Sequence, residues 1–268
     1  MTRHVRRVVA TAGFSLVELV VVISLLAILA VGSVTFFGYS LDGYGRSGVR
    51  ADLAASSMTA LARMATDLED ALPNSVRVSA DCIEFLPVRT VSRYVSIPRA
   101  MSAASMTLEA SDGGGIAPEP ARIAVNPDAA EHIYDAASSV LSPTATFSVP
   151  DAGGIITATF ATAHAFAEDS PQERVFLVDS PVSYCVSGQE LYRHSGYGYL
   201  VTQPGPADLP AAPPQRNLLV THIDADATQF TESPGGIIRN TILELRLVLR
   251  SGEDVVDAVR TVHIRHVP

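Results

Sequence analysis

The chain has 268 residues and carries 19 Arg and no Lys against 28 acidic residues, for a net charge of −9. This length suffices for one anchor helix plus one large domain, or for two small domains. An acidic chain without a basic cluster is poorly suited to nonspecific nucleic-acid binding, which depends on Lys and Arg neutralising phosphates. We therefore expect no nucleic-acid partner.

The N-terminus combines a basic leader with a long uncharged segment. Residues 1–7 include three Arg, and residues 19–41 carry no charge, enough to span about 35 Å as a helix. Glu18 stands at the head of this segment, where a carboxylate costs a few kcal/mol to insert into lipid. Cutting the chain between Gly13 and Phe14 would create an α-amino group four residues before Glu18. The same amine on a neighbouring subunit would neutralise Glu18 within the membrane.

This constellation is shared with a known family. The basic leader, Gly13, Phe14, the hydroxyl residue Ser15 and Leu16-Val17-Glu18-Leu19 precede an apolar helix. The pattern resembles that of type IV prepilins, both pilins and type II secretion pseudopilins. The resemblance implies cleavage after Gly13 by a prepilin peptidase, N-methylation of Phe14, and extraction from the inner membrane into a filament. The implied partners are other minor and major pilins, contacted through the N-terminal helix, and an inner-membrane assembly platform.

An ordinary secretory signal peptide is the alternative for the same segment, because it also has a charged start and an apolar core. Its apolar region is shorter, and its cleavage site follows that region. Here Gly13 precedes the apolar run, and residues 27–32 offer only a weak site. A signal peptide also gives no reason for Glu18.

Charge and cysteine content predict the compartment. Positive charge before the span and acidic character after it place the N-terminus in the cytoplasm and the bulk of the chain in the periplasm. In that oxidising compartment we favour a disulfide between Cys82 and Cys185 over two buried free thiols. The bridge would close a loop of roughly a hundred residues, worth at most about 4–5 kcal/mol in the chain-entropy model.

A second helical segment follows the span. Four glycines, the last of them Gly48, weaken a continuous helix here, either as a soft spot or as a linker at the membrane exit. Helical periodicity resumes at Val49 and Pro73 ends it. The recurring apolar residues of this segment are Val49, Leu53, Ala60, Leu61, Met64 and Leu68. They predict an amphipathic helix packed on a sheet.

After Pro73 the periodicity changes to two, which is typical of strands. The predicted strands are 75–79, 82–88, 144–149, 155–160, 174–178, 182–186, 190–194, 218–223, 237–249 and 255–264. Residues 112–115 and 204–214 are predicted loops. The expected fold is α+β and pilin-like, with a long helix packed on a mainly antiparallel β domain. Its parts are a leader 1–13, a transmembrane helix 14–41, an amphipathic continuation 42–72 and a periplasmic domain 73–268.

Several globular patches resemble minor pilins of the mannose-sensitive haemagglutinin (MSHA) pilus. They are Ala71–Val78, Asp81–Pro87, Val178–Cys185, Leu191–Arg193 and Gly196–Gly198, with a vaguer similarity at Val262–Pro268. Both cysteines fall inside matching patches, which supports their pairing. The region 101–170 has no patch that matches.

Catalytic motifs are not apparent in the sequence, so we expect neither an enzyme nor a cofactor or metal. The segment His222-Ile223-Asp224-Ala225-Asp226 offers metal-ligand types, but it lacks the Gly and distal Glu of a calcium loop, which favours a hydrogen-bonded turn. Four tyrosines are interpreted as core and cross-strand residues rather than a sugar-binding surface. They are Tyr184, Tyr192, Tyr197 and Tyr199.

The expected function is structural: a minor pilin that helps prime assembly of an MSHA-like pilus and sits at its tip. A minor pseudopilin of a type II secretion system is the nearer alternative, because it would share every N-terminal feature. A membrane-anchored periplasmic binding module or enzyme is the more distant one.

Overall fold

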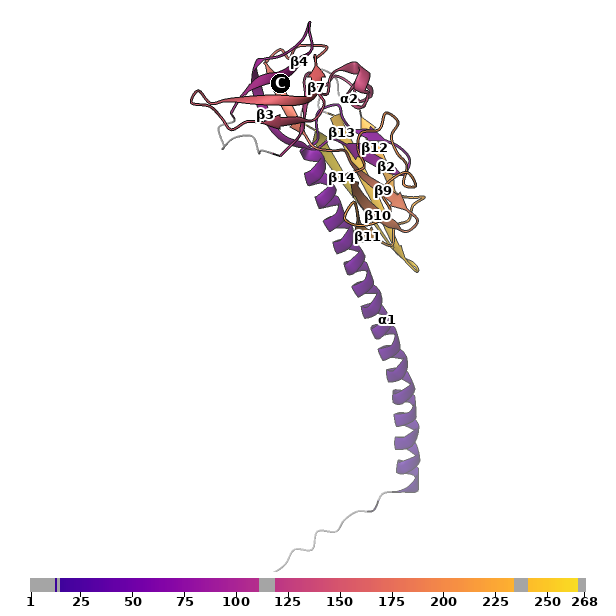
Figure 1. Cartoon of the computed structure of the whole chain (residues 1–268). Helices are drawn as coiled ribbons and strands as arrows, with labels where there is room; N and C mark the ends of the chain where they lie inside the picture. Colours follow the sequence, from indigo (N-terminus) through magenta and orange to yellow (C-terminus); the bar gives the residue numbers. More distant parts are fainter. Residues whose placement is uncertain (1–12, 14, 111–118, 234–240, 265–268) are drawn as a thin grey trace, which may run out of the picture. The chain divides into compact units, whose positions relative to one another are not determined.

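The computed structural model describes residues 13, 15–110, 119–233 and 241–264. The chain forms two compact units, Met1–Val49 and Arg50–Pro268. The helix α1, Leu16–Glu69, crosses from the first unit into the second (Figure 1). The predicted α+β class is confirmed, since the apolar N-terminal helix continues into a helix packed on antiparallel sheets.

The remaining elements all belong to the second unit. The strands are β1 Arg77–Val78, β2 Cys82–Phe85, β3 Val88–Ser96, β4 Ala103–Glu109, β5 Arg122–Ala124, β6 Ala145–Phe147, β7 Ile155–His164, β8 Arg174–Val178, β9 Val182–Ser187, β10 Glu190–Ser195, β11 Arg216–Thr221, β12 Gln229–Ser233, β13 Thr241–Ser251 and β14 Asp254–Ile264. Two short helices lie between β5 and β6, namely α2 Ala130–Tyr134 and the 3-10 turn η1 Ala136–Ser138.

The second unit is built around the C-terminal part of α1. Buried residues recur on one face of this helix at steps of three and four, including Leu61, Met64 and Leu68. Two antiparallel sheets share a core with that face, one ordered β1-β2-β9-β10-β11 and the other β12-β13-β14. In β13, Leu243 and Leu245 alternate with exposed residues and point into this core. The predicted amphipathic helix on a sheet is therefore present.

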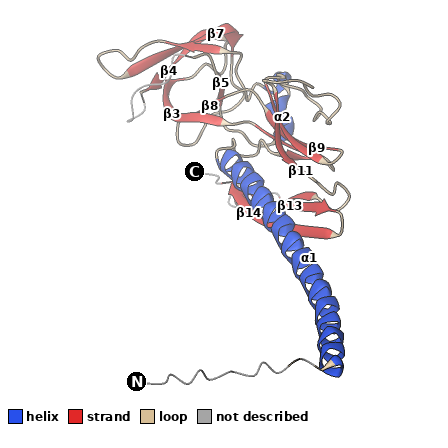
Figure 2. Cartoon of the chain, turned by 90° about the horizontal axis from the view of Figure 1, so that it is seen from below, coloured by secondary structure: helices blue, strands red, loops and turns tan. Residues whose placement is uncertain are grey.

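A small β-barrel is inserted between β2 and β9. Strands β3 to β8 form a sheet in the order β5-β8-β3-β4-β7-β6. Its end strands meet at Ala121 and Ala145, where each backbone N–H donates to the other residue's carbonyl, so the sheet closes. Met106, Ile156 and Phe160 help to fill the interior. Figure 2 shows β3, β4, β5, β7 and β8 grouped together.

The structure departs from the predicted boundaries at several places. The predicted strands 75–79 and 218–223 form as Arg77–Val78 and Arg216–Thr221, and strands β4, β5 and β12 and most of β3 were not predicted. Helix α1 ends at Glu69, not at residue 72, because the backbone of Asp70 to Leu72 bonds to residues 86–88 instead. The helix is also continuous through Gly43, Gly45 and Gly48, so a non-helical linker at the membrane exit is not what forms. The predicted loop 112–115, and the first residues of the predicted strand 237–249, lie outside the described residues.

Candidate functional site

The start of α1 is organised by Ser15 and Glu18. The Ser15 Oγ accepts a hydrogen bond of 3.1 Å from the backbone N–H of Glu18. Because Leu16 is the first helical residue, Ser15 is the N-cap and Glu18 the third helical residue, the two positions of a capping box. A carboxylate in the first turn also interacts favourably with the helix dipole. Glu18 therefore stabilises the helix start, in addition to any part in charge neutralisation.

The predicted cleavage site is described only on its Gly13 side, since Phe14 and residues 1–12 lie outside the described residues. Gly13 is exposed, and a Cβ built on it would meet no atom within 4 Å. Packing within this chain thus does not require glycine at position 13. A requirement for glycine at this position would therefore come from another molecule that binds or cleaves the chain there.

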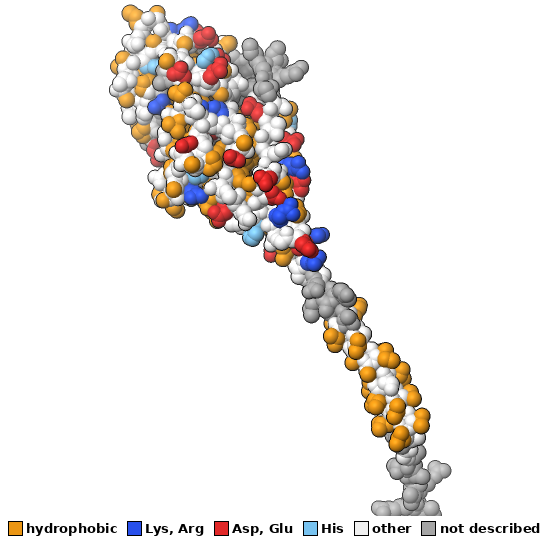
Figure 3. Space-filling model, turned by 90° about the vertical axis from the view of Figure 1, so that its right-hand side faces the viewer, with side chains coloured by type: hydrophobic (Ala, Val, Ile, Leu, Met, Phe, Trp, Pro, Cys, Tyr) orange, Lys and Arg blue, Asp and Glu red, His pale blue; other side chains and the backbone are white. Residues whose placement is uncertain are grey.

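The segment Leu16–Val34 is a helix of 19 residues with a mean hydropathy of 2.6, none of it buried, and it is long and apolar enough to cross a membrane. Figure 3 shows hydrophobic side chains along this part of the molecule. A continuous apolar surface of this length marks a membrane or protein contact. Such a segment near the N-terminus is typical of a membrane anchor or a signal sequence.

The polar side chains within this segment are satisfied by the helix itself. Ser24 Oγ donates to the Val20 carbonyl at 2.7 Å, and Ser33 Oγ donates to the Leu29 carbonyl at 2.8 Å. These bonds satisfy both hydroxyls within the helix, as a polar group requires where no water is present. Glu18 is the one charged side chain of the segment Leu16–Val34, and its carboxylate has no ion-pair partner among the described residues.

A second carboxylate of the same helix, that of Asp67, has several partners within its own domain. Asp67 accepts hydrogen bonds from Tyr184 Oη at 2.8 Å and from Arg193 Nε at 2.9 Å, and it pairs with Arg63 Nε at 3.1 Å. These contacts tie α1 to β9 and β10. Burial, and then the hydrogen bond to Asp67, raise the pKa of the Tyr184 hydroxyl well above its usual value.

The predicted disulfide is confirmed. Cys82 and Cys185 are direct partners on the antiparallel strands β2 and β9, with Cα atoms 4.2 Å apart, and the bond joins them. Both cysteines are fully buried and pack with Leu209 and Tyr197. The disulfide therefore links the neighbouring strands β2 and β9 covalently, in the sheet that packs against α1.

A buried ion pair lies beside the disulfide. Glu84 is fully buried and accepts hydrogen bonds from Arg77, at 2.8 Å from Nε, and from Tyr197 Oη at 2.9 Å. Arg77 also donates to the carbonyls of residues 200 and 201, and its guanidinium lies 3.6 Å from the Tyr134 ring centroid. Burial raises the pKa of the Glu84 carboxyl, while the Arg77 charge opposes that rise. The pair holds the segment after β10 against the disulfide.

Tyr184 in β9 and Tyr192 in β10 are sheet residues, as interpreted, whereas Tyr197 and Tyr199 are half-buried in the segment after β10. Tyr184 is fully buried and stacks on Phe85, with ring centroids 6.3 Å apart. Tyr199 Oη donates to the Asp179 carbonyl at 2.8 Å, and Tyr192 lies under the Arg216 guanidinium at 3.5 Å. They do not form a common aromatic surface, because each is engaged by a different part of the domain.

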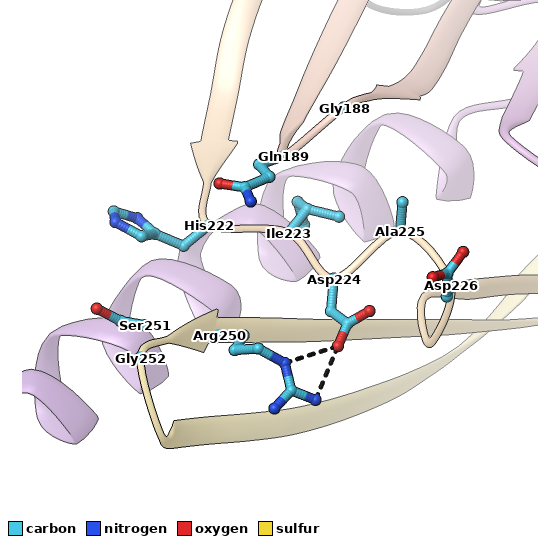
Figure 4. Close-up of a pocket in the computed structure, with 10 residues that line it drawn as sticks. All are labelled: Gly188, Gln189, His222, Ile223, Asp224, Ala225, Asp226, Arg250, Ser251 and Gly252. Atoms are coloured by element: carbon cyan, nitrogen blue, oxygen red, sulfur yellow. Dashed lines mark hydrogen bonds and ion pairs between the residues drawn. The ribbon is translucent and has the colours of Figure 1, made fainter.

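The segment His222–Asp226 lines an open pocket of about 460 Å³, shared with the β9–β10 and β13–β14 turns (Figure 4). Asp224 Oδ2 accepts from Arg250 Nε at 2.9 Å, and its backbone carbonyl accepts from the Thr228 N–H at 3.0 Å. The segment is thus the hydrogen-bonded turn that we predicted. Within the described part of the chain, no group of three His, Cys, Asp or Glu side chains could hold a metal ion.

Comparison with known proteins adds no assignment: no protein-family model, curated protein or solved structure matches the chain. The candidate site is therefore defined from the structure alone. It is an exposed apolar helical segment with a capped and charged first turn, and the helix continues into a disulfide-bridged domain.

Sequence reasoning missed two features of the site. The capping box was readable, since Ser15 and Glu18 have the S-x-x-E spacing ahead of an apolar run. The Arg77–Glu84 pair had no such signal, because a charged residue in a short strand is normally exposed. Only the pairing of β1 with β2, which places Arg77 opposite Glu84, brings the two together.

Proposed function

We propose that this chain is a minor pilin of an MSHA-like type IV pilus, a structural subunit that helps prime assembly and sits at the pilus tip. Its globular patches resemble the minor pilin MshO of that system. The observation that carries the proposal is the start of α1. A carboxylate stands at the head of the apolar helical segment Leu16–Val34, none of which is buried in its own chain, and this segment directly follows a sequence that resembles a prepilin cleavage site.

The proposed mechanism begins at the membrane. The apolar part of α1 anchors the subunit in the inner membrane with its globular domain in the periplasm. Prepilin peptidase removes residues 1–13 and leaves an amine on Phe14, which is then methylated. In the filament, Glu18 pairs with the amine of a neighbouring subunit, because an unpaired carboxylate in an apolar helix bundle is unfavourable. That pairing sets the axial register between subunits.

Processing is tested by mass spectrometry of the N-terminal peptide from membranes of the native host. The proposal expects a peptide that starts at Phe14 and carries one added methyl group. A protein that starts after residue 27 would return the segment to ordinary secretion and overturn the proposal. Genes for other MSHA-type pilins beside this one would separate the pilus from the type II secretion alternative.

The charge of Glu18 is tested by substitutions that separate it from helix capping. Glu18→Gln keeps a capping-box side chain but removes the charge, whereas Ser15→Ala removes the cap and keeps the charge. We expect Glu18→Gln to abolish most assembly, measured as surface pili counted by electron microscopy, with membrane insertion unchanged. Ser15→Ala should assemble nearly normally, because a lost cap costs only about 1 kcal/mol. The opposite ranking would show that Glu18 acts only as a cap.

A further inference from the structure

The outer face of the five-stranded sheet is covered by the segment between β10 and β11. Ile83, Tyr184 and Leu191 pack in the core with α1, so the alternate residues of the same strands point to the other side of the sheet. The disulfide lies on that outer side. One row of register partners there crosses all five strands, and its members are Arg77, Glu84, Ser183, His194 and Arg216.

The first part of the covering segment bonds to the β2 and β9 side of this row. Tyr197 Oη lies 2.7 Å from Ser183 Oγ and donates to Glu84 Oε1 at 2.9 Å. Gln203 Nε2 donates to the carbonyl of Cys82 at 3.2 Å. Several hydrogen bonds therefore hold residues 197–203 on the sheet.

The second part, residues 204–214, is here called the strap. Leu209 is buried and packs on Cys82 and Cys185, so the strap covers the disulfide. The Pro210 carbonyl accepts from His194 Nδ1 at 3.0 Å, whereas Arg216 Nη1 reaches the carbonyl of residue 211 only at 3.4 Å. Among the described residues, His194 therefore donates the shortest side-chain hydrogen bond from the sheet to the middle of the strap.

The geometry of His194 requires a neutral imidazole. The residue is only 2% exposed. Because a carbonyl can only accept, Nδ1 carries the ring proton, and Nε2 is left as an acceptor. Nε2 is buried and has no hydrogen-bond partner among the described residues. A proton added to Nε2 would therefore place an unpaired positive charge in a buried site, which is unfavourable.

The groups that face His194 give such a charge little support. Its register partners are the cation Arg216 on β11 and the neutral Ser183 on β9, and the Tyr192 ring lies 6.1 Å away on its own strand. Burial lowers the pKa of the His194 imidazole; the hydrogen bond to Pro210 opposes this effect, and the Arg216 charge adds to it. Further titratable groups on this side of the sheet and in the strap are Arg77, Glu84, Glu190, Tyr197 and Asp208.

We propose that the strap is an acid-sensitive cover of the outer sheet face and of the disulfide, held closed by the neutral imidazole of His194. When His194 gains a proton, its ring moves into water, the bond to Pro210 is lost and the strap opens. The strap is rich in Pro, which has no N–H, so few backbone donors hold it in place. This behaviour does not depend on the assembly that the chain joins.

The direction of the pH effect follows from the two states of His194. In an open strap the imidazole has an ordinary pKa of about 6.5, whereas in the closed strap burial lowers it. The closed form is therefore fully stable above about pH 6.5 and loses stability as the pH falls toward the lowered pKa. Since one proton is involved, the opening equilibrium changes by at most about tenfold per pH unit.

Reduction of the Cys82–Cys185 disulfide reports strap opening, because both cysteines are fully buried while the strap is closed. The full chain in nonionic detergent is treated with tris(2-carboxyethyl)phosphine. The rate of the same reagent with oxidised glutathione at each pH corrects for protonation of the phosphine. We expect the corrected rate to rise at least about threefold from pH 7 to pH 5. A constant or falling corrected rate would overturn the proposal.

Three variants assign the effect to His194. His194→Asn keeps an N–H donor near the position of Nδ1 but cannot titrate, so its corrected rate should equal that of wild type at pH 7 and stay constant to pH 5. Leu209→Ala thins the cover and should raise the rate at every pH. The matched control is His164→Asn in β7, because His164 Nε2 is also buried without a partner among the described residues and burial also lowers the pKa of His164.

The control variant should keep the wild-type pH dependence. Loss of that dependence in His164→Asn would show that acid acts on the barrel. An undiminished rise in His194→Asn would assign the effect to another group, with Glu84 the first candidate. Either result would overturn the proposal.

Amide exchange of the unmodified chain gives an independent measurement that needs no variant. After correction for intrinsic exchange rates, protection over residues 207–212 should fall at least about threefold between pH 7 and pH 5, with protection over β13 unchanged. An equal loss of protection over β13 would show that acid unfolds the whole unit rather than opening the strap, and the proposal would then be wrong.

Discussion

Two parts of helix α1 differ in whether their own chain covers their apolar side chains. Residues 16–34 of α1 expose apolar side chains on every side, whereas residues 50–69 bury a single stripe against two sheets. The helical backbone is the same in both parts, so the surroundings decide which residues are tolerated. The packed part finds its apolar partners within its own chain. The exposed part needs lipid or other helices to cover it.

The same contrast holds for the acidic residues of α1. Asp67 lies in the packed part and accepts from Tyr184 and Arg193, so its charge is neutralised within the domain. Glu18 lies at the head of the exposed part, where its backbone N–H donates to Ser15 Oγ, and its carboxylate has no ion-pair partner among the described residues. A folded domain thus supplies its own counter-charges. Under the proposed function, a neighbouring subunit supplies the counter-charge of Glu18.

The largest expected effect separates the two parts by equivalent truncations. Met64 is fully buried, and Met64→Ala should destabilise the Arg50–Pro268 unit by about 2–5 kcal/mol through the cavity that it leaves. Leu25 is 55% exposed, so Leu25→Ala should leave unfolding of this unit unchanged and weaken only partition into micelles. Urea denaturation of the full chain in detergent, followed by circular dichroism, measures both. Equal destabilisation by the two variants would contradict the distinction between the parts.

A smaller effect on folding stability is expected at high pH, from Tyr184, whose hydroxyl donates a hydrogen bond to Asp67. An unfolded tyrosine has a pKa of about 10, whereas burial and Asp67 hold the pKa of folded Tyr184 higher. Above pH 10 the unfolded state therefore loses a proton that the folded state keeps, and stability falls as pH rises. The slope is at most about 1.4 kcal/mol per pH unit for this residue, and it vanishes below pH 10.

The variant Tyr184→Phe checks the alkaline effect. It should unfold more readily at pH 7, because Asp67 loses a donor, but its stability should decline less steeply between pH 10 and 11. The remaining decline comes mainly from Tyr134, Tyr197 and Tyr199, whose hydroxyl pKa values burial also raises. An identical alkaline slope in wild type and variant would show that Tyr184 ionises as freely in the folded state as in the unfolded state.

Local pattern was sufficient to predict the long helix α1 and most long strands, because each depends on a repeating period of apolar residues, but it did not predict the short helices α2 and η1. It was also sufficient for the disulfide, since the chain has only two cysteines. It failed for the barrel. Strand β5 has three residues, and β4 begins Ala-Ala-Ser, so neither carries a clear period. Closure through Ala121 and Ala145 depends on contacts far apart in sequence, and alanine at either position signals nothing by itself.

The smallest expected effect comes from substituting the glycines between the exposed and the packed part of α1. These substitutions also test the boundary between the two parts. Gly43 and Gly45 are helical and exposed, and a Cβ at either would meet no atom within 4 Å. Gly43→Ala and Gly45→Ala should therefore each stabilise the local helix by about 1 kcal/mol. That gain should slow amide exchange near residue 45 about fivefold per substitution, with urea unfolding of the Arg50–Pro268 unit unchanged.

The matched reversal is Ala51→Gly, on an exposed helical position just inside the second unit, which should speed local exchange by a similar factor. If the glycines serve as a soft spot during assembly, the double alanine variant should reduce surface pili while Ala51→Gly should not. Normal piliation with the stiffened helix would remove any need for softness there. The glycines would then mark only the change of environment between an exposed apolar helix and one packed on its own sheets.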